Sequence, residues 1–388
     1  MNAVLPIGDA AAGQCDASPL AQTVREVCKT IEHRAAAARD EDVFVAENFA
    51  LLKDANLTAA GAPRELGGGG ASPDELSEML RTIGYHCGST ALAFSMHTHQ
   101  VAIPAWRWKH QNVAAVEPLL KRVVQERLIL SSSGGSDWIA GSGKAERVDG
   151  GYRITARKVF SSGAPVSDLL MTSAVLEELG QAPVVLHFGL PMTSPQVKIA
   201  ETWRTLGMRG TGSHDVVIEG HVVPEAAVSA RRPAGEWHPL FHIIATIAFP
   251  LIYSVYVGVA ERARDIALDL AKRKPASRHT LGTAGRMETE LNGARLALNF
   301  MLAAVRLNTP SAATVNQVMM GRQLVERHAI AAVELAMELA GGAGFYRAVR
   351  LEQRFRDIQA ARYHPLQAGP QAEFAGAVAL GLPTDKIY

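Results

Sequence analysis

The segment Lys158-Val-Phe-Ser-Ser-Gly-Ala-Pro-Val-Ser-Asp168 decides which fold this chain is expected to adopt. It begins with the pattern of a strand and ends as a Gly/Pro turn. The ring of Phe160 stands beside two small hydroxyls, Ser161 and Ser162, and Gly163 allows a close approach of the backbone. A flat heterocycle needs such a site, with an apolar plate and a hydroxyl for a ring nitrogen. An ordinary strand-to-turn junction has the same residues, so the surrounding motifs must decide between the two interpretations.

Two loops rich in Ser and Gly flank this segment in the sequence. The earlier loop is Leu130-Ser-Ser-Ser-Gly-Gly-Ser-Asp-Trp138, and the later one is Trp203-Arg-Thr-Leu-Gly-Met-Arg-Gly-Thr-Gly-Ser-His-Asp215. Short β-branched runs bounded by Gly, Pro or Asp lie between and beyond the loops, and Val148-Asp-Gly-Gly-Tyr152 has the pattern of a hairpin turn. These runs predict a β domain of roughly six to eight strands over residues 128–232.

Helical periodicity dominates on both sides of the β domain. Apolar residues repeat at three and four over residues 20–56, and Ser72 with Glu75 forms a capping box that opens a helix through Ile83. Long amphipathic segments over 240–273, 285–308, 311–341 and 347–362 predict an up-and-down bundle, with a further helix near 370–380. The expected fold is α+β and multidomain: a loose arm (1–18), an N-terminal helical domain (19–127), the central β barrel or sandwich (128–232) and a C-terminal four-helix bundle (233–388).

The composition is that of a soluble globular protein with no nucleic-acid partner. The 388 residues are 48% hydrophobic and 20% charged, with a net charge of +1 and no basic stripe interleaved with aromatic residues. Cys15, Cys28 and Cys87 lack metal-ligand spacing, so we expect no metal site and a reducing compartment. Because the N-terminus has neither the basic region nor the apolar core of an export signal, we expect a cytoplasmic protein.

One uncharged segment, residues 243–260, is long enough to cross a membrane. Pro250 interrupts it, and it continues directly into an amphipathic stretch over residues 261–273. A helix that is apolar all round at one end and amphipathic at the other is typical of the core of a large bundle. We therefore expect no membrane role.

A helical domain, a small β domain and a helical bundle, in this order, resemble the flavoproteins of the acyl-CoA dehydrogenase superfamily. The resemblance covers residues 20–385 and implies a homotetrameric flavin-dependent oxidoreductase with FAD. The motifs that carry it are Gly134-Gly-Ser-Asp137, Lys158 to Gly163, Leu206-Gly-Met-Arg-Gly210, Leu339-Ala-Gly-Gly-Ala-Gly-Phe345 and Arg356-Asp357.

The resemblance implies which residues contact the flavin. Phe160 would pack against the ring, and Ser162 would donate a hydrogen bond toward flavin N5. A polar rim of this kind stabilises the anionic reduced ring. The implied contact residues are Ser131, Ser132, Gly135, Ser136, Phe160, Ser161, Ser162 and Gly163.

The same resemblance implies a site for the remainder of the cofactor. Arg273 would lie near the pyrophosphate of a flavin bound largely by a neighbouring subunit, and Gly341 and Gly342 would let the backbone approach its ADP part. Glu338 stands where the family usually has Gln, and a carboxylate repels a diphosphate. FMN, taken up as a diffusible reduced flavin, is therefore the alternative cofactor.

The sequence departs from the family at the catalytic base. Acyl-CoA dehydrogenases remove a proton with a carboxylate, but the two family positions fall here on Pro365 and near Ala248, with Phe249 in place of the accompanying Arg. The tail is more similar to the flavin-dependent monooxygenases that share this fold, which take reduced flavin from a separate reductase and add oxygen at C4a. In that branch a histidine occurs in the region of His364, although a histidine before Pro365 could equally cap a helix.

We hypothesise that His364 is the acid/base group, aided by His97 or His99, because histidine titrates near neutral pH. Three functions stay open at this point: a monooxygenase, an acyl-CoA dehydrogenase with a non-standard base, and a non-catalytic protein that binds flavin or an acyl ligand. The implied partners are a small hydrophobic or acyl substrate and a flavin reductase or electron-transfer protein. The expected substrate pocket is lined by Phe94, Met96, Phe241, Phe249 and Tyr363.

Overall fold

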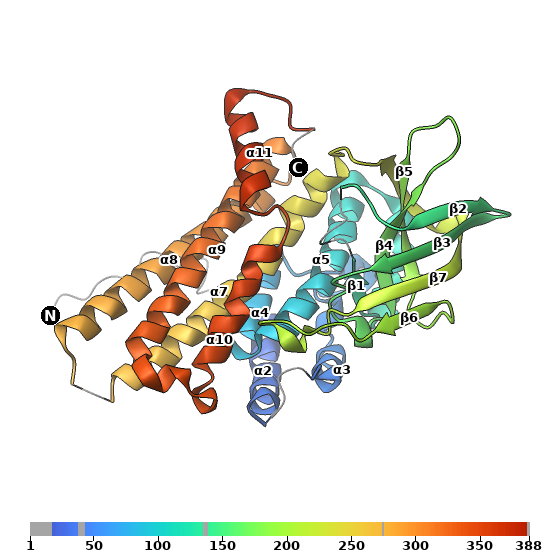
Figure 1. Ribbon diagram of the computed structural model, residues 1–388. Helices are drawn as coiled ribbons and strands as arrows, with labels where there is room; N and C mark the ends of the chain where they lie inside the picture. Colours follow the sequence, from blue (N-terminus) through green and yellow to red (C-terminus); the bar gives the residue numbers. More distant parts are fainter. Residues whose placement is uncertain (1–17, 38–42, 134, 136–138, 274, 386–388) are drawn as a thin grey trace.

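The computed structural model describes residues 18–37, 43–133, 135, 139–273 and 275–385. Helices come first, a curled sheet follows, and long helices complete the chain, with the sheet on one side of the molecule and the long helices on the other (Figure 1). The expected order of a helical, a β and a second helical region is confirmed. Almost all of the expected arm, residues 1–17, lies outside the described residues.

The N-terminal region consists of helices joined by short turns. They are α2 (Pro19–Ala37), α3 (Ala46–Asp54), α4 (Pro73–His86), α5 (Gly88–Gln111) and α6 (Glu117–Gln125). The predicted capping box is confirmed, because Ser72 Oγ accepts from the Glu75 backbone N–H at 3.2 Å and Glu75 Oε2 accepts from the Ser72 N–H at 2.9 Å. α4 continues one turn beyond the expected Ile83.

The central region is an eight-stranded sheet with the order β6-β7-β3-β2-β4-β5-β8, and β1 pairs with β4 in parallel. In β3 the side chains alternate, so that Tyr152, Ile154 and Ala156 are buried while Arg153 is exposed. Val148 faces Gly151 across the predicted hairpin. The strands are β1 (Leu130–Ser132), β2 (Lys144–Val148), β3 (Gly151–Lys158), β4 (Leu169–Leu176), β5 (Val184–Pro191), β6 (Val197–Ala200), β7 (Asp215–Pro224) and β8 (Val228–Pro233).

The C-terminal region differs from the expected bundle in two places. Helix 285–308 begins earlier, at Arg278, because Ser277 caps it by accepting from the Thr280 N–H at 3.1 Å. The expected fourth long helix over 347–362 is short, because Arg350 adopts a left-handed backbone (φ 63°) before it and a 3₁₀ turn follows it. The helices are α7 (Leu240–Ala271), α8 (Arg278–Arg306), α9 (Ala312–Ala340), α10 (Leu351–Ile358) and α11 (Ala368–Leu380).

Helix α7 is the core of the molecule. Its uncharged part could cross a membrane by length and composition, but 94% of its most apolar window is buried inside the protein, as expected of a core helix. α4 crosses α7 closely, since a Cβ on Gly84 would lie only 2.7 Å from the Val255 carbonyl oxygen. Any larger residue at position 84 would therefore separate the two helices.

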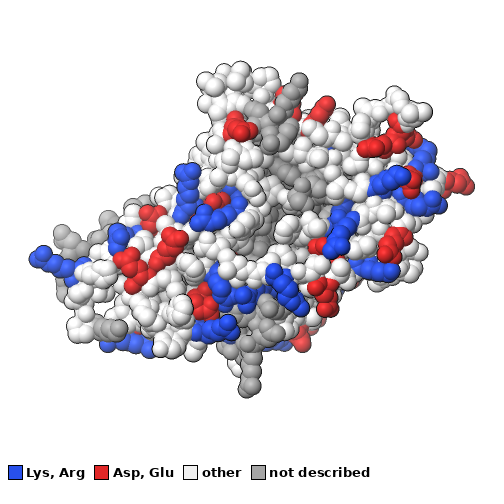
Figure 2. Space-filling view, in the orientation of Figure 1, with Lys and Arg blue, Asp and Glu red and all other residues white. Residues whose placement is uncertain are grey.

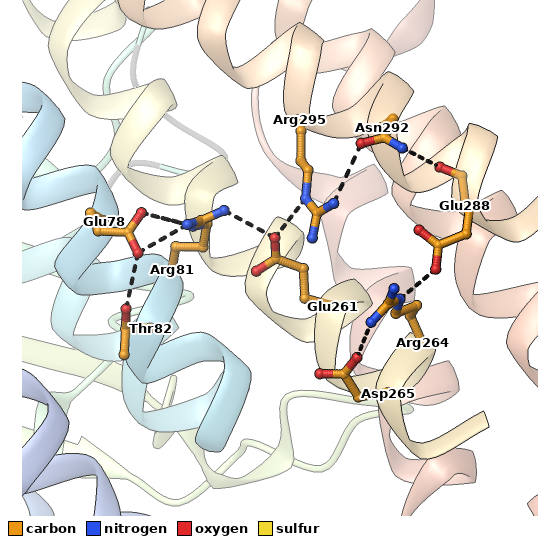
Figure 3. Close-up of polar contacts among 9 residues, drawn as sticks. All are labelled: Glu78, Arg81, Thr82, Glu261, Arg264, Asp265, Glu288, Asn292 and Arg295. Carbon is orange, nitrogen blue, oxygen red and sulfur yellow. Dashed lines mark hydrogen bonds and ion pairs between the residues drawn. The ribbon is translucent and has the colours of Figure 1, made fainter. Parts of the chain in front are cut away.

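A ladder of polar side chains links α4, α7 and α8 (Figure 3). At its centre Glu261 Oε1 accepts from Arg81 at 3.0 Å and from Arg295 at 2.8 Å, so one carboxylate joins three helices. On the face seen in Figure 2, acidic and basic side chains are interspersed. No continuous basic surface for a polyanion is visible on that face.

The sheet is attached to the C-terminal helices through two of the motifs quoted above. Asp357 Oδ1 on α10 accepts from the Met208 backbone N–H at 2.6 Å, and Arg356 donates to the Leu206 carbonyl at 3.4 Å. Gly207 lies directly on the Arg356 carbonyl, where a side chain would not fit. The Arg356-Asp357 pair therefore holds the 206–210 loop rather than standing free.

We predict that Glu261→Ala lowers the free energy of unfolding by about 1–3 kcal/mol, because two arginines lose their shared acceptor. Glu26→Ala is the matched control: its exposed pair with Lys29 spans one turn of a single helix, and its loss should cost below about 0.5 kcal/mol. Urea denaturation followed by circular dichroism measures both. Equal effects of the two substitutions would contradict a structural role for the ladder.

Candidate active site

A cavity of about 270 Å³ lies where the sheet meets α5, α7 and the segment after α10. One face of α5 contributes side chains at helical spacing, and α7 contributes an apolar wall. Hydroxyl groups from β1 and β4 form the polar side. The lining side chains that matter below are Met96, His99, Ile103, Arg107, Ser132, Ser133, Thr172, Phe241, Ile244, Ala248, Phe249, Ile252, His364 and Pro365.

The structure places three of the five expected pocket residues at this cavity, namely Met96, Phe241 and Phe249. Phe94 does not line it. Two positions before Met96, Phe94 points to another side of α5, where it is fully buried and stacks on His97 with ring centroids 5.4 Å apart. Tyr363 does not line it either, because its position in the 3₁₀ turn leaves it 67% exposed.

His364 reaches the cavity from the segment between α10 and α11. Its Nε2 lies 2.6 Å from the hydroxyl of Tyr256, a fully buried residue of α7. Burial, with Arg322 and His99 nearby, lowers the pKa of His364 from 6.5 to about 3. The expectation that this histidine titrates near neutral pH is therefore corrected: its imidazole is neutral there and is hydrogen-bonded to Tyr256.

A buried arginine fixes the backbone that carries His364. Arg322 of α9 is fully buried and donates to the carbonyl oxygens of Ala361 at 3.2 Å and of His364 at 2.8 Å. Its charge is balanced by Glu326 one turn later, at 3.0 Å. It also lies over the Tyr253 ring, 5.3 Å from the centroid. His364 is therefore held by its backbone as well as by its ring.

The two histidines of α5 have different environments. His97 Nε2 lies 2.7 Å from the Thr58 carbonyl, and its Nδ1 accepts from the Leu130 N–H at 3.1 Å, so both ring nitrogens are occupied by backbone. His99 lines the cavity, with Nδ1 2.9 Å from the Ser95 carbonyl. Burial lowers the pKa of each from 6.5 to about 4. Of the two, His99 can meet a ligand, whereas His97 joins α5 to β1.

The segment that opened the sequence analysis ends in an unusual backbone. Phe160 has a left-handed φ of 55°, which is costly for a bulky residue, and its ring is 52% exposed against the edge of Trp203. Backbone bonds hold this conformation, since Ser161 N–H donates to His214 O at 3.2 Å and Gly163 N–H donates to Thr211 O at 2.9 Å. The strained turn therefore leaves the aromatic ring of Phe160 partly exposed to solvent rather than buried in the core.

A chain of hydroxyls stands behind this turn. Ser162 Oγ is 2.7 Å from Ser213 Oγ, which is 2.7 Å from Thr211 Oγ1. Ser161 points the other way, fully buried, and its hydroxyl donates to the Lys158 carbonyl at 3.2 Å. Ser162 is therefore the hydroxyl of the pair that is available to a ligand at this strand end. Gly163 lies against Ala93 of α5, one turn before Met96.

The loop after β1 supplies further hydroxyls. Ser131 is buried, with Oγ directed to the Leu169 carbonyl at 3.5 Å, whereas Ser132 lines the cavity with Oγ 3.7 Å from the sulfur of Met96. Ser133, which the sequence reasoning missed, also lines it and lies 2.6 Å from Thr172 Oγ1. Gly135 lines the cavity with open space where a Cβ would stand. Ser136 lies outside the described residues.

The residues expected to meet the rest of the cofactor lie away from this cavity. Gly341 and Gly342 follow the end of α9 and face open space. Arg273 lies beyond Ala271, the last residue of α7, which is about 28 Å along the helix axis from Ile252 in the cavity wall. Glu338 is neutralised within the chain.

Two neighbours on α8 account for that neutralisation. Arg286 donates to the Glu338 carboxylate at 2.8 Å, and the Thr283 hydroxyl donates to the same carboxylate at 2.9 Å. Hydrogen bonding to Thr283 and the charge of Arg286 lower the pKa of Glu338. The carboxylate is thus a paired surface group, which weakens the argument that it repels a diphosphate.

Ala248 and Pro365, at or near which the resemblance puts the two family positions for a catalytic carboxylate, line the cavity, and so does Phe249. None of the described residues that line the cavity is Asp or Glu. Removal of a substrate proton by a carboxylate therefore has no support from this part of the chain.

Three protein-family models match the chain in order. They are the acyl-CoA dehydrogenase N-terminal domain over residues 16–112, the middle domain over 131–221 and the C-terminal domain over 251–367. The chain belongs to the acyl-CoA dehydrogenase superfamily. The expected superfamily, its architecture and the class of flavin-dependent oxidoreductase are thereby confirmed.

Curated members of the superfamily similar to this chain have diverse names. The amino sugar nitrososynthase DnmZ of Streptomyces peucetius is 27% identical, covering 86% of each chain. The putative acyl-CoA dehydrogenase YdbM of Bacillus subtilis is 26% identical, covering 86% of this chain and 90% of its own. The pigment production hydroxylase of a Rhodococcus species is 26% identical, with 94% and 97% covered.

Among solved structures, KijD3 in complex with FMN and dTDP-3-amino-2,3,6-trideoxy-4-keto-3-methyl-D-glucose superimposes with a TM-score of 0.86. The two chains are 24% identical, and the match covers 99% of this chain and 97% of KijD3. The likeness shows the same fold from end to end.

Sequence reasoning missed Tyr256, Arg322 and Arg107. Tyr256 and Arg322 meet His364 across 108 and 42 residues, and the sequence carries no spacing signal for such contacts. A weak signal did exist for Arg322, because a charged residue within the apolar pattern of α9 requires a buried partner. Arg107 continues the stripe of Met96, at a helical spacing that could have been noticed.

We predict that stability falls with acidity partly through His97. Below pH 6.5 the unfolded chain protonates this side chain, while the folded protein does not until about pH 4. His97 therefore lowers the free energy of unfolding by about 2 kcal/mol near pH 5, relative to neutral pH. His97→Gln should reduce the difference between urea midpoints at neutral pH and at about pH 5.

The exposed His33 provides the control for this measurement. His33→Gln should keep the wild-type dependence on pH. The same pH dependence in wild type and His97→Gln would show that His97 does not stay neutral in the fold.

Proposed function

We propose that this protein is a flavin-dependent monooxygenase that acts on a small, largely apolar substrate. The observation that carries the proposal is the cavity itself, whose described lining has no Asp or Glu and includes three histidines, of which burial keeps His99 and His364 neutral. The relationship to a hydroxylase and to nitrososynthases supports the same chemistry.

The chain offers groups that fit a flavin ring. The exposed Phe160 would pack against it, Ser162 would donate to its N5 edge, and Ser132 and Gly135 would border it at the cavity mouth. The bound cofactor would supply two electrons to molecular oxygen, so that one oxygen atom enters the substrate and the other leaves as water. FMN and FAD both remain compatible with these contacts, with reduced flavin supplied by a separate reductase.

The chain's own residues would position the substrate and control protons. Apolar residues of α7, with Ile103, form a wall of the cavity that would limit the access of water to the substrate. His364 can donate or accept one hydrogen bond at the substrate, because Tyr256 holds its ring and Arg322 its backbone. His99 offers a second neutral imidazole at the same cavity.

The decisive experiment mixes the protein with photoreduced FMN or FAD, oxygen and indole as an apolar probe. We expect oxygenated indole, labelled from ¹⁸O₂, at a rate above that of free flavin. Anaerobic bleaching of bound oxidised flavin by an acyl-CoA would instead favour desaturation. If flavin binds but neither reaction occurs, the protein is a binding protein and the proposal fails.

We predict that His364→Gln lowers product formation about 10²-fold while flavin still binds, because the imidazole is lost from the cavity but the fold is retained. Tyr256→Phe should have a smaller effect in the same direction, since it frees the ring without removing it. The control is His328→Gln, which alters a histidine paired with Glu290 rather than one that lines the cavity. Product formation at the wild-type rate in His364→Gln would exclude this histidine from the reaction.

We predict that Ser162→Ala weakens flavin binding about tenfold through loss of one hydrogen bond to the ring. Flavin fluorescence titration gives the dissociation constants. Ser194→Ala, which removes a half-buried hydroxyl of the same domain that bonds Gln196 and His221, should bind flavin like the wild type. Unchanged binding in both variants would place the ring away from this strand end.

A further inference from the structure

Arg107 stands out among the residues of the cavity. It continues the stripe of α5 after Met96, His99 and Ile103, and it is the one Asp, Glu, Lys or Arg among the described residues that line the cavity. The remaining lining side chains are apolar or carry a hydroxyl, an amide or an imidazole. A permanent positive charge is therefore built into a largely apolar cavity.

The guanidinium has no protein partner within the described ranges. Its Nε–H is buried and makes no hydrogen bond, and no ion pair of Arg107 with a described carboxylate is formed. The buried Arg322 also has an Nε–H without a hydrogen bond, but its terminal nitrogens contact Glu326 and the carbonyl oxygens of Ala361 and His364. An arginine that lacks such acceptors is poised for an anion that comes from outside.

We propose that Arg107 binds an anionic group of the substrate, a carboxylate, sulfonate or phosphate, and so selects small apolar molecules that carry one negative charge. This inference rests on the proposed substrate cavity and adds its specificity. Along α5, Arg107 is eight residues from His99, about 12 Å of helix rise. The anion would thus be held at one end of the cavity, while the reacting part lies toward His99 and His364.

A flavin phosphate is the other anion that this region could meet. Arg107 lies 14 residues beyond Ala93, the α5 residue that touches Gly163, which is about 21 Å along the helix. The expected position of the flavin ring is at that strand end. The geometry therefore favours a substrate anion over a cofactor phosphate.

Two fluorescent probes test the inference without any turnover. 8-Anilinonaphthalene-1-sulfonate and N-phenyl-1-naphthylamine share an apolar body, and the first alone carries a sulfonate. Wild type should bind the sulfonate more tightly. Arg107→Gln should weaken sulfonate binding about tenfold or more and leave the neutral probe unchanged, whereas Arg107→Lys should retain part of the preference.

Arg122→Gln is the matched control, because Arg122 is an exposed arginine on the neighbouring α6 that pairs with Glu126. It should leave both probes unaffected. Equal weakening of both probes in Arg107→Gln, or no weakening of either, would overturn the inference.

A second titration separates the two sources of the anion. FMN and riboflavin differ by the phosphate, so Arg107→Gln should affect their binding equally. Selective weakening of FMN would assign Arg107 to the cofactor and overturn the inference about substrate. Failure of the indole reaction with the sulfonate preference intact would reject the monooxygenase proposal but not the role of Arg107.

Discussion

The buried pair of Arg322 and Glu326 is the interaction on which the candidate site depends. A guanidinium removed from water is tolerated only when a countercharge and hydrogen-bond acceptors surround it. Here one carboxylate and the carbonyl oxygens of the 361–364 segment fulfil that need. The segment consequently cannot relax away from α9. His364 therefore lies at the cavity because the buried guanidinium on α9 needs the backbone carbonyls of this segment as acceptors.

The cavity is a product of junctions between regions. α5 belongs to the N-terminal helices, the hydroxyls belong to the sheet, and His364 belongs to the tail (Figure 1). A hydrogen bond stabilises each of two junctions: His97 joins α5 to β1, and Asp357 joins α10 to the loop before β7. In both bonds the side chain accepts from a backbone N–H group, so the relative position of the two elements depends little on side-chain packing.

The electrostatic character of the cavity follows from this enclosure. Burial keeps His99 and His364 neutral, so neither adds a charge, and none of the described lining residues is Asp or Glu. Among the described lining residues the guanidinium of Arg107 is then the one permanently charged group, in a cavity whose walls are largely apolar. A monooxygenase site and a selective site for an anionic substrate are therefore compatible within one cavity.

The sequence by itself determined the order of the regions, the capping box at Ser72, the alternation in β3 and the apolar character of α7, because these depend on local periodicity and caps. It also indicated the strand end at Phe160 and the absence of a carboxylate near Pro365. Tertiary structure alone decided that His97 is occupied by backbone, that Phe94 turns into the core, and that Tyr256 and Arg322 hold His364. Those contacts join residues far apart in the chain, so they depend on packing between elements, which no local pattern records.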